Sequence, residues 1–183
     1  MSRVVAGSAR GRRLVVPPGS ATRPTADRTR EALFSSLVSL RGSLVGVAFL
    51  DLYAGSGAVG LEAASRGAAR VVLVERAAGA LRALRANVDA LALPGVEVRA
   101  EPVERMLAAA PDQPYDVVFC DPPYADPVAE VLDALASGGW LTADAVVVVE
   151  RATRDPELHW PAGLEPVRSR SYGEGTLWYG RRS

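Results

Sequence analysis

From residue 47 onward, short apolar runs alternate with segments whose apolar residues recur every three to four positions. The apolar runs are six or seven residues long, which is typical of strands: VAFLDLY (47–53), RVVLVE (70–75), VEVRAE (96–101), YDVVFCD (115–121) and AVVVVER (145–151). The intervening periodicity predicts helices over 58–67, 77–93 and 103–110, and one that starts at Asp126 and Pro127. Nearly continuous Val and Leu runs indicate parallel strands buried on both faces of a sheet.

The tail of the chain, roughly residues 164–181, holds two more extended runs around the turn sequence YGEG. These predict an antiparallel hairpin at the edge of the sheet. We therefore expect an α/β fold, doubly wound, with a mostly parallel seven-stranded sheet of the Rossmann-like kind.

The first 40 residues have a different pattern. Two β-branched runs, 3–6 and 13–16, flank a turn rich in Gly and Arg, and two prolines end the second run, so we expect a β-hairpin. A helix is expected to follow the hairpin, because Thr25 is a favourable N-cap residue and the residues after it form one apolar face. This face consists of Leu33, Phe34, Leu37 and Leu40. We predict a basic hairpin extension at residues 1–22 and one larger domain at residues 23–183.

The charges are unevenly placed although the formal net charge is zero. Residues 1–30 contain one acidic residue, Asp27, and seven arginines: Arg3, Arg10, Arg12, Arg13, Arg23, Arg28 and Arg30. A basic arm on a mildly acidic body is typical of a protein that binds nucleic acid. From charge alone, a solvated tail remains the alternative.

Composition excludes several classes. No apolar run is long enough to span a bilayer, and no secretory signal pattern is present, so we expect no membrane partner. One cysteine allows no internal disulfide and fits a reducing cytoplasm. With one histidine and one cysteine, a zinc site is not expected. The oligomeric state stays open, with a monomer as the expectation.

The first strand of the larger domain ends in a glycine loop, DLYAGSGAVG. Gly55, Gly57 and Gly60 form a GxGxxG between strand and helix, where such sheets bind ligands, and Glu75 ends the next strand, where an acid binds a ribose diol. The pattern also fits a nicotinamide or flavin enzyme, or a tight turn without a ligand. Asp51 favours a methyl donor, because a carboxylate repels a pyrophosphate but attracts the cationic end of S-adenosylmethionine.

The fourth strand ends in DPPY, residues 121–124. The Asp121 carboxylate and the Pro122 carbonyl can each accept one N–H of an exocyclic amine, and Tyr124 can stack on a base that is flipped out. Cys120 raises the alternative of a cytosine-C5 methyltransferase, but on a strand it points away from Asp121, which favours an inert buried thiol.

Together these motifs resemble class I S-adenosylmethionine-dependent methyltransferases that methylate amines. The segment RPTADRTREALF (23–34) and the arginine hairpin before it are similar to the RsmD family, bacterial enzymes that modify N2 of a guanine in 16S ribosomal RNA. YGEGTLWY resembles the closing hairpin of that family, although Gly175 departs from the usual spacing. The resemblance covers essentially the whole chain.

The resemblance implies roles for individual residues. S-adenosylmethionine would contact Arg23, Thr25, Asp51, Tyr53, Gly55, Ser56, Gly57, Glu75, Glu101, Pro102 and Asp121. Asp121, Pro122 and Tyr124 would act on the base, and RNA would be bound by Arg3, Arg10, Arg12, Arg13, Arg28 and Arg30. The partner would be 16S rRNA or a small-subunit assembly particle. The alternatives are a DNA adenine-N6 or cytosine-N4 methyltransferase, for which the chain has no room for a target-recognition region, and a non-catalytic nucleotide-binding module.

Overall fold

A seven-stranded sheet forms the centre of the molecule. The computed structural model describes residues 2–17, 24–123 and 128–183, without the side chains of residues 24–26. The strand order is β5-β4-β3-β6-β7-β9-β8, and the strands are β3 (Ala48–Leu52), β4 (Arg70–Val74), β5 (Val96–Arg99), β6 (Tyr115–Cys120), β7 (Leu141–Ala152), β8 (Leu164–Tyr172) and β9 (Gly175–Arg182). Strands β3 to β7 pair in parallel, and β9 pairs antiparallel with both β7 and β8. The predicted fold class is confirmed.

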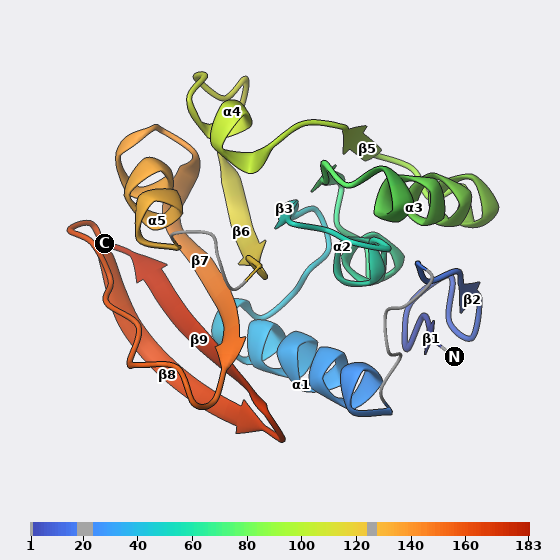
Figure 1. The fold of residues 1–183 in the computed structure, drawn as a ribbon, viewed down its shortest axis with the longest axis horizontal. Coiled ribbons are helices and arrows are strands. Elements are labelled where there is room, and N and C mark those ends of the chain that lie inside the picture. Colours follow the sequence, from blue (N-terminus) through green and yellow to red (C-terminus); the bar gives the residue numbers. More distant parts are fainter. Residues whose placement is uncertain (1, 18–23, 124–127) are drawn as a thin grey trace.

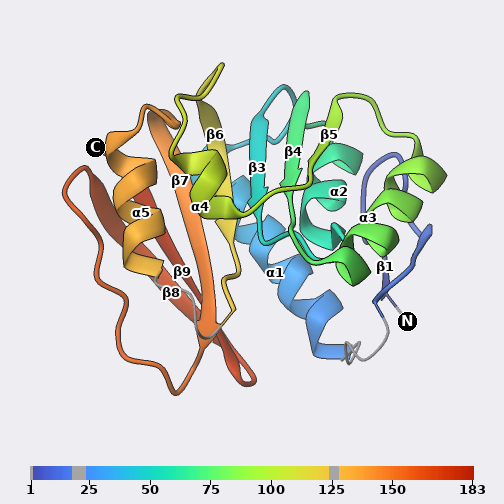
Figure 2. The ribbon, with the colours of Figure 1, turned by 45° about the horizontal axis from the view of Figure 1, so that its top comes forward.

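Helices cover both faces of this sheet, as Figures 1 and 2 show. The helices are α1 (Pro24–Arg41), α2 (Ala58–Ser65), α3 (Ala78–Leu91), α4 (Val103–Leu107) and α5 (Val128–Ser137). Side chains of α1, α2 and α3 share one buried cluster with Phe49 and Phe119, whereas those of α4 and α5 share the other with Leu50 and Cys120. Successive residues of β3 and β6 thus enter opposite cores, because side chains alternate along a strand. No helix among the described residues is both long and apolar enough to cross a membrane.

The N-terminal hairpin is present but shorter than predicted. Its strands are β1 (Ser2–Arg3) and β2 (Arg13–Leu14). Beyond Val4 the backbone N–H groups of Val5, Ala6 and Ser8 bond to helix α2 instead of extending the ladder. The Glu62 carboxylate accepts the N–H groups of Val5 and Ala6 at 2.8 and 2.9 Å. Gly7 has φ +82°, and a Cβ there would lie 1.9 Å from the Ser65 carbonyl oxygen, so only glycine allows this approach.

Hydrophobic contacts also attach the hairpin to the body. Val4, Ala9 and Leu14 are buried in the cluster formed with α1, α2 and α3. We propose that residues 1–22 are an extension that depends on this shared core, since a two-stranded hairpin is marginal alone.

Two further boundaries differ from the sequence prediction. Strand β7 begins at Leu141 rather than 145, and its pairing with β6 shifts register between Tyr115 and Val117. The predicted helix start at Asp126 and Pro127 lies outside the described residues, and α5 is described from Val128.

Candidate active site

The glycine loop lies where the strand order reverses. From β3 the chain goes to β4 on one side, and the next strand to pair with β3 on the other side is β6, so the carboxyl ends of β3 and β6 border a crevice of the kind that binds ligands in such sheets. Gly55 has φ +59°, and a Cβ there would meet nothing within 4 Å, so space lies in front of this turn. A Cβ on Gly60 would instead lie 2.1 Å from Leu73 Cδ2, so this glycine allows α2 to pack against β4.

Two carboxylates hold this loop. The Asp51 side chain, 1% exposed, accepts the Gly60 N–H at 2.8 Å. Glu75 accepts the Gly55 N–H at 2.9 Å through Oε2, and through Oε1 it accepts the N–H groups of Arg76 and Ala77 at 2.8 Å. Glu75 therefore fixes the turn at Gly55, a role that its spacing did not predict, and its contact with a ribose stays a prediction.

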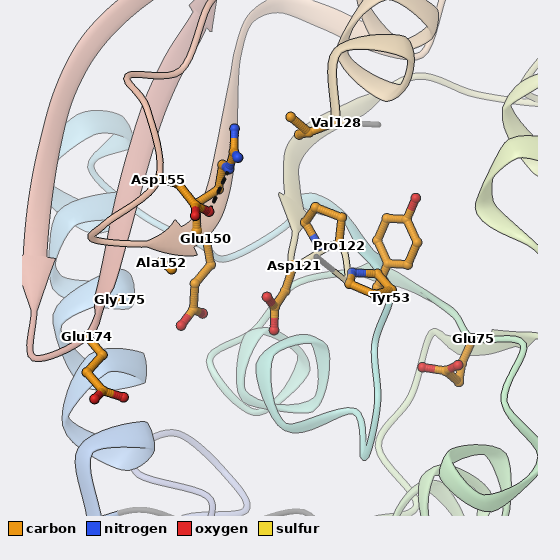
Figure 3. Close-up of a pocket in the computed structure, with 12 residues that line it drawn as sticks. Tyr53, Glu75, Asp121, Pro122, Val128, Glu150, Ala152, Asp155, Glu174 and Gly175 are labelled. Atoms are coloured by element: carbon orange, nitrogen blue, oxygen red, sulfur yellow. Dashed lines mark hydrogen bonds and ion pairs between the residues drawn. The ribbon is translucent and has the colours of Figure 1, made fainter. Parts of the chain in front are cut away.

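Asp121 and Pro122 follow β6 at the same edge of the sheet. Cys120 pairs with Leu52 on one side and with Val149 on the other, so Asp121 lies beside Tyr53 and Glu150. Figure 3 shows the carboxylates of Asp121 and Glu150 directed into the same cavity. Tyr124, predicted to act on the base, lies outside the described residues.

A cavity of about 590 Å³ opens at these strand ends, a volume within the usual range for a small-molecule site. Its walls come from the ends of β3, β4, β6 and β7 and from the β8–β9 turn. The residues that line it include Tyr53, Glu75, Asp121, Pro122, Pro123, Val128, Glu150, Arg151, Asp155, Glu174 and Gly175. Among the described residues of the lining, five are acidic and Arg151 is the one that is basic; its Nε is 3.2 Å from Asp155 Oδ2.

The acidic groups perturb one another. Burial raises the pKa of Asp51 to about 7; the charge of Glu75 adds to this rise and the Gly60 N–H opposes it. Burial, then the charge of Glu150, then that of Asp51 raise the pKa of Asp121, and burial raises that of Glu150. Such shifts favour a ligand that brings positive charge or N–H donors.

The remaining described residues that were predicted to contact the cofactor are not among those that line the cavity. Glu101 and Pro102 lie between β5 and α4, and neither lines the cavity. The Ser56 carbonyl accepts the Asn87 amide at 2.9 Å, and Gly57, with φ +81°, is the N-cap of α2. Arg23 and the side chain of Thr25 lie outside the described residues.

Arg30 is not placed as an RNA contact. Arg3, Arg10, Arg12, Arg13 and Arg28 are exposed, whereas Arg30 is 4% exposed. Its guanidinium bonds to Asp27 at 3.0 Å, lies 3.5 Å from the buried Glu62 carboxylate and donates to the Arg3 carbonyl. The expectation of a phosphate contact is therefore corrected, because this arginine ties α1 to the arm and α2.

Glu150 is the residue that sequence reasoning missed. Glu150 ends a buried strand, as Asp121 does, so it could have been predicted at the site if β6 and β7 had been expected to pair with each other. Cys120, in contrast, is fully buried, and burial raises its pKa well above the ordinary thiol value, so no reactive thiolate is available. No cluster of metal-ligating side chains occurs in the described part of the chain.

Comparison with known proteins gives the family. The model described as Conserved hypothetical protein 95 matches residues 2–181. Ribosomal RNA small subunit methyltransferase D of Escherichia coli K12 is 38% identical, over 94% of this chain and 85% of the relative, and that of Haemophilus influenzae is 33% identical, over 93% and 89%. The solved structure of yhhF from Escherichia coli has a TM-score of 0.87 at 32% identity, covering 99% of this chain and 97% of the other. The chain therefore belongs to the RsmD family of ribosomal RNA small subunit methyltransferases.

Proposed function

We propose that this protein is a cytoplasmic enzyme that transfers a methyl group from S-adenosylmethionine to the exocyclic N2 amine of a guanine in 16S rRNA. The observation that carries the proposal is the position of Asp121 and Pro122 at the end of β6, on the wall of a cavity bordered by the glycine loop strand. The relatives named as rRNA small subunit methyltransferases support the RNA substrate.

The residues of the crevice fit the cofactor. Asp51 is buried and is not among the residues that line the cavity, but its carboxylate, whose pKa is raised, favours a cationic group nearby; the space in front of Gly55 admits a ligand close to the backbone. Glu75 keeps one lone pair of Oε2 for a ribose hydroxyl, since its other three acceptor positions are used by backbone N–H groups. When bound, S-adenosylmethionine supplies an electrophilic methyl group.

The chain's own groups orient the acceptor. An amine on a purine is a poor nucleophile because its lone pair is delocalised into the ring. The Asp121 carboxylate and the Pro122 carbonyl each accept one N–H, which holds the nitrogen in line with the methyl carbon. The nitrogen loses a proton as it gains the methyl group, and a carboxylate whose pKa is raised, as at Asp121, is suited to accept it. We assign Tyr124 to stacking on the base, and the exposed arginines of the hairpin to phosphate contacts.

The test is methylation of unmethylated 16S rRNA, or of small-subunit particles, with radiolabelled donor, followed by mass spectrometry of the digested nucleosides. We expect N2-methylguanosine with the wild-type protein. Asp121→Ala should abolish transfer and leave the affinity for S-adenosylhomocysteine within a few-fold. The control is Asp133→Ala, on the exposed side of α5. Methylation of adenine or cytosine, or more than about a tenth of wild-type turnover in Asp121→Ala, would refute the proposal.

A further inference from the structure

Glu150 is placed beside the base-binding position by strand register. Val149 on β7 pairs with Cys120 on β6, so Glu150 is level with Asp121 on the neighbouring strand, at the usual separation of about 4.8 Å. Both side chains project from the sheet face that carries Phe119 and Val148, and both reach the cavity (Figure 3). The cavity therefore has two carboxylate acceptors next to one another along one wall.

The Glu150 carboxylate is not held by a cation or a hydrogen-bond donor in the described part of the structure. Among the residues that the structure describes, no hydrogen bond or ion pair reaches it, and the adjacent guanidinium, Arg151, is paired with Asp155. On β9 the register partner of Glu150 is Leu177. Gly175, two residues before it, pairs with Ala152, and a Cβ on Gly175 would lie 3.3 Å from Glu150 Oε1. This is the position at which the chain departs from the expected hairpin spacing. A larger residue there would crowd the Glu150 carboxylate slightly, so glycine leaves it more room beside the cavity.

We infer that Glu150 accepts the N1–H of the target guanine and thereby selects guanine over the other amine-bearing bases. The inference rests on the proposed function, in which Asp121 and Pro122 hold the N2 amine. On guanine the neighbour of that amine on the Watson–Crick edge is N1–H, a donor. On adenine and cytosine the ring nitrogen next to the exocyclic amine is an acceptor, N1 or N3.

A carboxylate beside the amine site therefore distinguishes these bases by whether the neighbouring ring nitrogen carries a proton. It forms a charge-assisted hydrogen bond with the guanine N1–H, whereas it faces the lone pair of adenine or cytosine with no proton between them. Two hydrogen bonds to one base edge usually make a protein bind the correct base much more tightly than a wrong base. Two adjacent acceptors on the enzyme match the two adjacent donors that guanine presents.

The experiment uses Glu150→Gln and two forms of the rRNA substrate. The methylated position is first mapped with the wild-type enzyme, and the RNA is then prepared with either guanine or 2-aminopurine there. 2-Aminopurine keeps the same exocyclic amine but has an acceptor at N1. Assays run above neutral pH, so that the carboxylates are ionised. We expect the wild type to prefer guanine strongly, and Glu150→Gln to reduce the ratio of the two kcat/KM values by about 10- to 100-fold, because the amide can donate to N1.

Two controls separate this result from a structural effect. Glu165→Gln makes the same change at an exposed position of β8 and should leave the ratio unchanged. Glu150→Ala, which can neither accept nor donate, should lower guanine methylation without improving 2-aminopurine methylation. Binding of S-adenosylhomocysteine, measured by calorimetry, reports that each variant is folded.

The outcomes are distinguishable. If the wild type makes no N2-methylguanosine, the proposed function fails. If it does, and Glu150→Gln and Glu150→Ala keep the wild-type ratio while binding the demethylated donor normally, Glu150 does not read N1 and the inference is overturned.

Discussion

Replacing Asp51 with asparagine should make the protein more stable at neutral and alkaline pH. The carboxyl group titrates near 3.8 in the unfolded chain but at about 7 in the folded protein, because it is buried. The folded state therefore holds the proton more tightly, and the stability that this gives is complete below pH about 4 and is lost as the pH rises through 7. A shift of about three units at 1.36 kcal/mol each corresponds to about 4 kcal/mol.

Asparagine stays neutral at every pH and can still accept the Gly60 N–H that Asp51 accepts at 2.8 Å. In urea unfolding at several pH values, the free energy of unfolding of Asp51→Asn minus that of the wild type should increase by about 4 kcal/mol between pH 4 and pH 8. Part of this difference arises through Asp121, whose pKa Asp51 also raises. Asp133→Asn, at an exposed position of α5, should give a constant difference. A difference for Asp51→Asn that stayed constant within about 1 kcal/mol would refute the reasoning.

Three further variants address the loop, the buried arginine and the arm. Glu75→Ala should weaken S-adenosylhomocysteine binding by about 1.5–3 kcal/mol and speed amide exchange at Gly55; unchanged affinity in calorimetry would show that Glu75 does not bind the ribose. Arg30→Ala should lower the free energy of unfolding by about 3–5 kcal/mol, since Glu62 stays buried with one ion pair fewer, and a loss under about 1 kcal/mol would contradict this role. Replacing four exposed arginines with alanine should flatten the slope of log RNA affinity against log salt concentration, by about 0.7 per lost phosphate contact if the contacted RNA is single-stranded. The four are Arg3, Arg10, Arg12 and Arg13, and an unchanged slope would exclude their role in RNA binding.

The parts of the structure that could be predicted from the sequence are those that depend on neighbouring residues in the chain. Strands at β3, β4 and β6 follow from continuous apolar runs, and the glycine loop and the acid at the end of β4 follow from fixed spacings. The loop contact itself joins Gly55 and Glu75, which adjacent parallel strands bring to one edge of the sheet. Local pattern and strand order together were therefore enough to find the crevice.

Residues whose role depends on a distant partner were not predictable in this way. Arg30 has the same charge and sequence context as the exposed Arg28, and it differs in contacts made on folding, with the buried Glu62 carboxylate and with the Arg3 carbonyl. Glu150 needed the β6–β7 register, which sets it level with Asp121. The early start of β7 at Leu141 also depends on pairing, because the polar residues that follow give no strand signal.

The arrangement of charge connects the two halves of the proposed reaction. Asp51 is one of the groups that raise the pKa of Asp121, so a cation bound near Asp51 lowers that pKa by offsetting the repulsion. In the proposed reaction the ionised form of Asp121 accepts an amine N–H, and in the inferred base contact the ionised form of Glu150 accepts the N1–H. Binding of a cationic donor should therefore favour binding of the guanine, and by linkage the guanine favours the donor to the same extent. The carboxylates that repel one another in the free enzyme are then stabilised together only when both substrates are present.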